Sequence, residues 1–260
     1  MYLPQLLART DKGEKLSVLT CYDASFARLL VENGVDVLLV GDSLGMTVQG
    51  HSSTLPVTLE QMVYHTDAVV RGAAGGAFVM ADLPFGSYQK SPQQAFDAAA
   101  RLMAVGANMV KLEGGAIMVE SVRFLSQRGI PVCAHLGLLP QSVNVTGYRA
   151  QARDAGAATQ LLQDAGDLEN AGAQMLVLES IPAALAEAVT QRLRIPSIGI
   201  GAGPHCNAQV LVLQDLLGLT PKPPRFSKNF MTGAGDLAAA IRAYVAAVKS
   251  GEFPGPEHAF

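Results

Sequence analysis

Residues 34–46 read Gly-Val-Asp-Val-Leu-Leu-Val-Gly-Asp-Ser-Leu-Gly-Met, a short apolar run that ends in an acid, a hydroxyl and glycines. An apolar run of this length between glycines is typical of a strand buried on both faces of a parallel sheet. Parallel α/β folds bind their ligands at the carboxyl ends of such strands. Asp42, which follows the apolar run, is therefore expected at a ligand-binding rim.

The same arrangement recurs three times further along the chain. Apolar runs end in Asp82, in Glu113 and in Glu179. A single acid after a strand more often caps the following helix, but acids at the ends of four strands favour a functional cluster. We therefore expect four buried strands to bring four carboxylates to one rim.

Alternating strands and helices predict the architecture. The expected strands cover residues 16–21, 37–41, 77–82, 108–113, 131–135, 174–179, 196–201 and 210–215. A first helix over 4–13 is expected to close the bottom of a barrel, and a last helix covers 236–249. Eight strands in 260 residues favour one α/β domain over residues 1–260, a closed (β/α)8 or TIM barrel. An open doubly wound sheet is the alternative.

Several helix ends are marked by capping residues. Asp23 suits the N-cap of a helix over 24–33, and Gly34 suits its C-terminal stop. Thr58 and Gln61 have the spacing of a capping box at the start of a later helix. These signals place the helix starts independently of the apolar pattern.

Composition limits the partners of the protein. The formal net charge is −3 and no basic cluster stands out, which argues against nucleic acid or an anionic membrane as a partner. The first 16 residues lack the apolar core of a signal peptide, and no run is long enough to span a bilayer. Cys21, Cys133 and Cys206 form no CxxC pair, and the first two lie in strand-like runs, where a reduced and buried thiol is ordinary. A soluble, cytoplasmic protein is expected.

Strand periodicity predicts which side chains share the barrel interior, because residues two apart lie on one face. If Glu113 points inward, Lys111 does too. The same count gives the inward pairs Asp42 with Val40, Asp82 with Met80, His135 with Cys133, and Glu179 with Val177. A buried Lys111 needs a counter-charge, and Glu113 is a candidate. His135 is either a hydrogen-bonded core residue or a ligand contact.

Converging carboxylates require a compensating cation. Two carboxylates about 4 Å apart repel each other by on the order of 4 kcal/mol at an effective dielectric constant near 20. Lys111 is one available charge, and a divalent metal is the other. No cysteines and histidines have the spacing of a zinc site, and oxygen ligands favour Mg²⁺. Magnesium leaves positions open for a chelating α-keto acid, whose keto oxygen it polarises and whose neighbouring C–H it acidifies.

Two further segments allow alternative interpretations. Residues 198–203, Ile-Gly-Ile-Gly-Ala-Gly, lack the GxGxxG spacing of a dinucleotide-binding turn. They either bind an anion or let the backbone approach a neighbour closely. Arg225, Lys228 and Asn229 either bind an anionic tail or lie on the surface.

Several long motifs carry a family resemblance. These are VGDSLGMTVQGH (40–51), STLPVT (53–58), ADLPF (81–85), VKLEGG (110–115), HLGLLPQSVN (135–144), LVLESIP (176–182) and IGIGAG (198–203). Together they resemble the 3-methyl-2-oxobutanoate hydroxymethyltransferases, also called ketopantoate hydroxymethyltransferases. The resemblance runs in order from about Thr20 to the end of the chain.

This resemblance implies an enzyme with a TIM barrel of the phosphoenolpyruvate/pyruvate-binding type, assembled as a homo-oligomer that is usually a decamer. The implied reaction transfers a one-carbon unit from 5,10-methylenetetrahydrofolate to 3-methyl-2-oxobutanoate. The product would be 2-dehydropantoate, on the route to pantothenate and coenzyme A.

The matching motifs also imply roles for individual residues. Asp42 and Asp82 would ligate Mg²⁺ and contact the substrate, with Glu113 beside them directly or through water. Ser43 and Lys111 would hold the carboxylate and the enolate oxygen of the keto acid. Glu179 would be the base that removes the C3 proton. The remaining residue carried over is His135, which would line the substrate pocket.

One segment departs from the family pattern, and two other functions stay open as alternatives. Residues 144–153 form a shorter loop with one glycine where two are usual and Ala152 before Arg153. A Mg-dependent carbon–carbon lyase of the isocitrate-lyase type is the alternative enzyme, although such lyases carry a reactive cysteine in a mobile loop. A non-catalytic scaffold that binds keto acids is the third hypothesis, and it has no use for Glu179.

Overall fold

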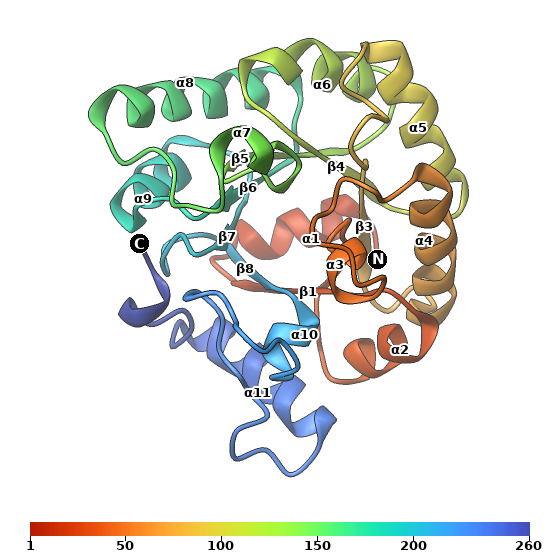
Figure 1. Ribbon diagram of the computed structural model, residues 1–260, viewed down its shortest axis with the longest axis vertical. Coiled ribbons are helices and arrows are strands. Elements are labelled where there is room, and N and C mark those ends of the chain that lie inside the picture. The colour runs from red at the N-terminus through yellow and green to blue at the C-terminus, as the bar shows by residue number, and fades with distance from the viewer.

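Eight short parallel strands close into a barrel in which each strand pairs with the next and β8 pairs with β1. The structure is a computed structural model that describes residues 1–260 (Figure 1). The strands are β1 (Leu16–Thr20), β2 (Val37–Val40), β3 (Phe78–Asp82), β4 (Met109–Glu113), β5 (Val132–Gly137), β6 (Met175–Glu179), β7 (Ser197–Ile200) and β8 (Ala208–Leu211). The predicted (β/α)8 barrel is confirmed, and the open sheet is wrong.

Helices surround the barrel on its outside (Figure 1). The α-helices are α1 (Leu3–Thr10), α2 (Ala24–Glu32), α3 (Leu44–Thr47), α4 (Leu59–Ala73), α5 (Pro92–Ala104), α6 (Val119–Ser126), α7 (Val143–Thr146), α8 (Ala155–Ala171), α9 (Ala183–Arg192), α10 (Leu213–Leu216) and α11 (Leu237–Ser250). Short 3₁₀ turns are η1 (Ala116–Met118), η2 (Pro140–Ser142) and η3 (Pro256–His258). None of the helices combines the length and the hydropathy that a membrane span requires.

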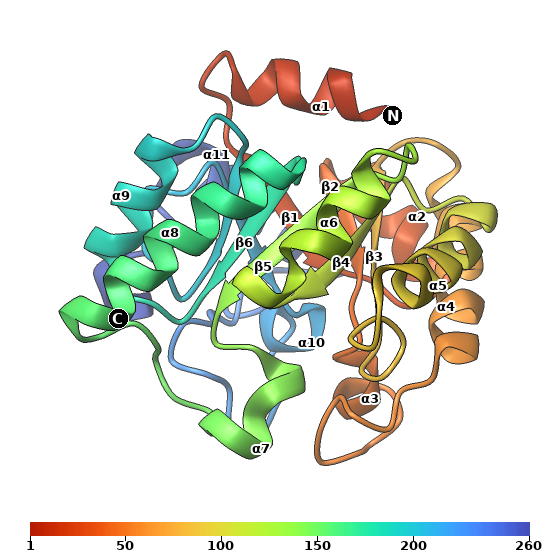
Figure 2. The same ribbon diagram turned by 90° about the horizontal axis from the view of Figure 1, so that it is seen from above.

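The two ends of the barrel differ. Figure 2 shows α1 lying across one end, with α3 and α7 at the opposite end. Leu6 of α1 is fully buried and packs with apolar side chains inside the barrel, including Leu16. The predicted first helix therefore does close the amino-terminal end of the strands, although it ends at Thr10 rather than at residue 13. The carboxyl ends of the strands remain for the functional site.

Side chains of the strands divide into two apolar layers. Met80, Met109 and Val177 belong to the layer inside the barrel. Val110 and Leu178 belong to the larger layer between the strands and the helices. Both faces of each strand are therefore buried, which is why the strands read as nearly continuous apolar runs.

Local capping chemistry agrees with the sequence. The Asp23 side chain accepts hydrogen bonds from the backbone N–H groups of Ser25 and Phe26 at the start of α2. Thr58 and Gln61 form the predicted capping box of α4. The helix starts follow from these local hydrogen bonds.

The last predicted strand is partly wrong. The sequence predicts a strand over 210–215, whereas β8 ends at Leu211 and residues from Leu213 onward form α10. Pairing of β8 with β1 stops at Leu211, and the backbone N–H of Leu213 instead donates to the Thr20 hydroxyl at 2.9 Å. Apolar residues continue past this point because the short helix is itself buried, so their pattern does not mark the end of the strand.

Gly72 allows α4 to approach α2 closely. A Cβ at this position would lie 2.3 Å from the carbonyl oxygen of Ala24, a backbone atom. We therefore expect Gly72→Ala to lower the free energy of unfolding by about 1–3 kcal/mol, because the two helices must move apart. Denaturant unfolding measures the change. Gly235→Ala is the control, because no atom lies within 4 Å of the Cβ that it adds, and an equal loss in both variants would contradict the expectation.

Candidate active site

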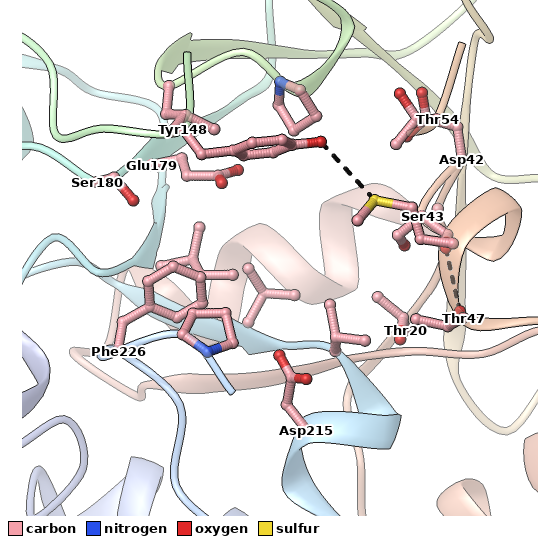
Figure 3. A pocket seen from close by; sticks show the side chains of 18 of the residues that line it. Thr20, Asp42, Ser43, Thr47, Thr54, Tyr148, Glu179, Ser180, Asp215 and Phe226 are labelled. Atoms are coloured by element: carbon pink, nitrogen blue, oxygen red, sulfur yellow. Dashed lines mark hydrogen bonds between the residues drawn. The ribbon is translucent and has the colours of Figure 1, made fainter. Parts of the chain in front are cut away.

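A cavity of about 860 Å³ opens at the carboxyl ends of the strands (Figure 3). All seven site residues predicted from the sequence line it: Asp42, Ser43, Asp82, Lys111, Glu113, His135 and Glu179. Each of five consecutive strands, β2 to β6, carries at least one of these ionisable residues at or just after its carboxyl end. The predicted convergence of the strand ends is therefore confirmed as an arrangement in space.

Asp42 reaches the cavity by a different path from the one that periodicity predicts. Val40 faces the helices, and Leu39 lines the cavity. The pairing of Asp42 with Val40 on the inner face is therefore wrong. Strand β2 ends at Val40, and the chain then turns through Gly41, so the alternation of faces no longer holds at Asp42. For Asp82, Lys111, His135 and Glu179 the predicted inner partners are confirmed.

Lys111 forms an ion pair with Asp82 rather than with Glu113. Lys111 Nζ lies 2.8 Å from Asp82 Oδ1, and both side chains are almost fully buried. The direct counter-charge is thus Asp82, which faces Lys111 across the paired strands β3 and β4, whereas the candidate Glu113 forms no ion pair with Lys111 and contributes only its charge. Burial alone lowers the pKa of Lys111, but the charges of Asp82, Glu113 and Asp42 outweigh it and raise the pKa above its ordinary value. Lys111 is therefore a charged ammonium in a buried acidic site.

Gln141 connects the acids of the rim, a role that the sequence did not reveal. Its Nε2 donates to Asp42 Oδ2 and to the Leu83 carbonyl, both at 2.9 Å. Its backbone N–H donates to Glu113 Oε2 at 3.0 Å, and its Oε1 accepts from the Tyr88 hydroxyl at 2.7 Å. Gln141 thus fixes one oxygen of each of two carboxylates. The motif at 135–144 contained it, but no periodicity points a loop glutamine at a partner 99 residues away.

His135 lies between two carboxylates. Its Nδ1 is 3.6 Å from Glu113 Oε1, and its Nε2 is 3.3 Å from Glu179 Oε2. Burial lowers the pKa of His135, as does Lys111, but the contacts with Glu113 and Glu179 outweigh them and raise it above its ordinary value. Burial raises the pKa of Glu113, and the contact with His135 reverses this, so that the pKa is lowered. His135 is buried and also lines the cavity, so its position allows the contact with a ligand that was one of the two alternatives.

Ser43 is held by an aromatic hydroxyl. The Tyr22 hydroxyl and Ser43 Oγ are 2.9 Å apart, and Ser43 immediately precedes α3. Burial raises the pKa of Tyr22 to about 12, so the phenol keeps its proton. This hydroxyl–hydroxyl contact holds Ser43 at the cavity, beside Asp42 (Figure 3).

The carboxylates of the rim fit a divalent cation completed by a substrate. No three His, Cys, Asp or Glu side chains lie close enough to form a full metal site by themselves. Magnesium is commonly held by one or two carboxylates, with substrate and water in the other positions. Glu113 Oε1 is buried without a hydrogen bond, and so is Asp82 Oδ1 apart from its ion pair with Lys111. Burial, followed by the charges of Asp82 and Glu113, raises the pKa of Asp42. A nearby cation would stabilise the ionised carboxylate and lower this pKa again.

The loop after β5 covers part of the cavity. Tyr148 lines the cavity, and its hydroxyl points to Met46 Sδ at 3.9 Å (Figure 3). Ala152 adopts a φ of 52°, a left-handed conformation that favours glycine. Ala152 therefore stands at a position where glycine would fit with less strain.

The cysteines do not line the cavity. All three are buried and free. Burial raises the pKa of Cys21 and of Cys133 to about 12 and also raises the pKa of Cys206. None is a reactive thiol in a loop over the cavity, as the lyase alternative requires.

Comparisons with known proteins agree with the geometry. A family model of ketopantoate hydroxymethyltransferases matches residues 1–256. A 3-methyl-2-oxobutanoate hydroxymethyltransferase of Thiobacillus denitrificans is 65% identical over 259 residues, which cover 99% of this chain and 98% of that protein. One of Methylobacillus flagellatus is 62% identical and covers 100% of both.

Solved structures show the same fold at low identity. A 2,3-dimethylmalate lyase of the PEP mutase/isocitrate lyase superfamily has a TM-score of 0.59 at 18% identity and covers 80% of each chain. A phosphonopyruvate hydrolase in complex with oxalate and Mg²⁺ has a TM-score of 0.65 at 12% identity and covers 84% of each. These solved structures share only the fold with this chain, whereas the family model matches its sequence over residues 1–256. The protein belongs to the ketopantoate hydroxymethyltransferase family.

Proposed function

We propose that the protein uses 5,10-methylenetetrahydrofolate and Mg²⁺ to form 2-dehydropantoate from 3-methyl-2-oxobutanoate, with Glu179 as the base. Hydroxymethyl transfer to this keto acid, in pantothenate synthesis, is the activity of the family to which the chain belongs. The donor, the metal and the residue roles go beyond the family name. The observation that carries them is one cavity in which three fixed carboxylates and a lysine lie opposite a fourth, less constrained carboxylate.

Asp42 and Asp82 would hold the metal, with Glu113 beside them directly or through water. Asp42 Oδ2 accepts from Gln141, which leaves Oδ1 available. The backbone N–H of Asp42 donates to Asp82 Oδ2 at 3.1 Å, which ties the two candidate ligands together. When bound, Mg²⁺ polarises the keto group of a chelating α-keto acid and acidifies the adjacent C–H.

Lys111 and Ser43 would orient the keto acid. The Lys111 ammonium remains charged in the buried site and can stabilise negative charge that develops on the keto oxygen when the enolate forms. The Ser43 hydroxyl can donate to the substrate carboxylate, because it lies at the cavity beside Asp42. Both groups are already in place before the substrate binds, so little reorganisation is needed.

Glu179 is the carboxylate best suited to accept a proton. Its side chain is 15% exposed, whereas those of Asp82 and Glu113 are 4% and 3% exposed. Its only ion-pair partner is His135, and its carboxylate points into the cavity (Figure 3). Glu179 can therefore approach the C3 hydrogen of a keto acid without giving up a structural hydrogen bond.

The carbon–carbon bond then forms between two substrates. Water releases the methylene carbon of the folate as formaldehyde, and tetrahydrofolate leaves with the electrons of both broken carbon–nitrogen bonds and the two protons of the water. The C3 carbon of the enolate attacks this carbon, and the alkoxide that forms takes up the proton held by Glu179. No residue of the chain needs to form a covalent bond with a substrate, which agrees with the burial of all three cysteines.

The most direct test is the complete reaction. We expect the purified protein to form 2-dehydropantoate from 3-methyl-2-oxobutanoate and 5,10-methylenetetrahydrofolate, and to stop when the divalent metal is removed by a chelator. Mass spectrometry of the product measures this. Restoration by added Mg²⁺ is the control. Product formation that is unaffected by the chelator would contradict the role of the metal, and no product at all would contradict the proposal. The homo-oligomer, the decamer and the cytoplasmic location stay predictions.

A further inference from the structure

Asp215 is a buried carboxylate that none of the steps above uses. It lies in α10, just after β8, and is 6% exposed. It lines the same cavity as the acids of the rim. Figure 3 shows its carboxylate pointing into the cavity, with Tyr148 on the opposite side. A buried carboxylate in a ligand cavity needs hydrogen-bond donors.

The donors within the chain do not satisfy Asp215. The Thr220 hydroxyl donates to Asp215 Oδ1 at 2.5 Å, and this is its only side-chain hydrogen bond. Asp215 takes part in none of the ion pairs of the protein. Burial raises the pKa of Asp215, and the hydrogen bond from Thr220 opposes this only in part. Oδ2 has no donor in the chain, and Asp215 lines the cavity, so a ligand there can donate to this oxygen.

Asp215 lies in the half of the rim that the keto acid does not need. The groups for the keto acid come from β2 to β6, whereas Asp215 follows β8. This part of the cavity is lined by uncharged residues of the barrel, Thr20 of β1, Ile200 of β7 and Val210 of β8, and the segment after α10 adds Lys222 and Arg225 to the lining. A volume of about 860 Å³ lies in the range of about 300–1,000 Å³ that holds drug-sized ligands. A five-carbon keto acid fills only a small part of it.

The same half of the cavity suits a flat ring with hydrogen-bond donors on its edge. Tyr148 and Phe226 lie on different sides of the cavity and can contact the faces of a ring (Figure 3). Gln214, next to Asp215, also lines the cavity, and its Oε1 is buried without a hydrogen-bond partner. The wall thus presents the Asp215 carboxylate beside aromatic surfaces.

We propose that Asp215 is the residue that recognises the pterin ring of the folate substrate. The pterin carries a 2-amino group and an N3–H side by side, and a carboxylate can accept both in two parallel hydrogen bonds, as it does from arginine. This inference rests on the proposed function, because it requires the folate as the one-carbon donor.

A purely structural role for Asp215 is the competing explanation. The hydrogen bond between Thr220 and Asp215 closes the chain just after α10. If Asp215 only held this segment in place, removal of the hydrogen bond from either side would have the same effect. Thr220→Val removes the hydrogen bond but leaves the carboxylate in the cavity, and it is therefore the matched control.

The test compares Asp215→Asn with Thr220→Val. In Asp215→Asn we expect the KM for 5,10-methylenetetrahydrofolate to rise roughly 10- to 100-fold, because a neutral amide cannot accept both hydrogen bonds. The folate-independent exchange of the C3 hydrogen of 3-methyl-2-oxobutanoate should fall far less than this. Thr220→Val should raise the KM for the folate by a clearly smaller factor.

A modified folate tests the contact directly. An analogue in which the 2-amino group is replaced by methyl should bind the wild-type protein more weakly than the natural folate. In Asp215→Asn, which has lost one of the two acceptor oxygens, the analogue and the natural folate should differ much less in affinity. Equal discrimination in both proteins would overturn the inference, as would equal losses in Asp215→Asn and Thr220→Val. A wild-type protein that forms 2-dehydropantoate without using the folate would overturn the proposed donor, and the inference with it.

Discussion

Glu179→Gln should still bind 3-methyl-2-oxobutanoate in the presence of Mg²⁺. The rate at which it exchanges the C3 hydrogen of the keto acid with solvent should be lower than that of the wild-type protein by a factor of roughly 100 or more. General bases of this kind contribute about 10²–10⁴ in rate. The amide keeps the size of the side chain, so the cavity and the contacts of Asp42, Asp82 and Lys111 should persist. Nuclear magnetic resonance in deuterated water measures the exchange, and the folate is not required.

The exchange assay isolates proton removal from carbon–carbon bond formation. Glu187→Gln is the matched control, because Glu187 is an exposed carboxylate in α9, beyond the rim. It should exchange at the wild-type rate. Undiminished exchange in Glu179→Gln would exclude Glu179 as the base and would direct attention to His135, which lies 3.3 Å from it.

Asp82→Asn should abolish the stabilisation that Mg²⁺ and the keto acid together give to the wild-type protein. A ligand at 100 times its Kd adds about 2.7 kcal/mol to the free energy of unfolding, which raises the Tm of a protein of this size by several degrees, since about 2–4 °C correspond to 1 kcal/mol. Loss of one carboxylate ligand should remove this increase. Thermal unfolding with and without Mg²⁺ and the keto acid measures it.

The same substitution also removes the partner of Lys111. Loss of one member of a buried ion pair costs about 3–5 kcal/mol, so the Tm without ligand should fall as well. The expected result is therefore the absence of a ligand-dependent shift, not the lower Tm alone. Asp67→Asn, in the exposed pair with Arg71, should keep the full shift. If Mg²⁺ and the keto acid raise the Tm of Asp82→Asn as much as that of the wild-type protein, Asp82 is not a metal ligand.

Local patterns along the chain were sufficient to predict the barrel. Each strand is buried on both faces, so its apolar run stands out in the sequence, as at Val37–Val40. Helix starts carry their own hydrogen-bonding residues, such as Asp23 and Thr58. The largest error in a strand boundary lies after β8, because α10 is short and buried, so its composition resembles that of the strand before it.

The acids of the rim were also predictable, since parallel strands deliver their carboxyl ends to one edge. Which residues pair there was not. Lys111 pairs with Asp82 of the neighbouring strand instead of Glu113 on its own strand. Asp42 enters the cavity through a turn that breaks the alternation of faces. Such pairings depend on the register between strands and on the geometry of turns, neither of which leaves a periodic trace in the sequence.

The sequence alone thus led to the barrel, the acidic rim and the family, because burial and capping act between residues close in the chain and the motifs are contiguous. The closed barrel decided the rest. It brings Gln141 to Asp42 across 99 residues, and it turns Asp215, which the sequence had assigned to a strand, into a carboxylate facing the cavity. Hydrogen bonds between side chains so far apart form only when every strand has its partner, so only the tertiary structure could show them.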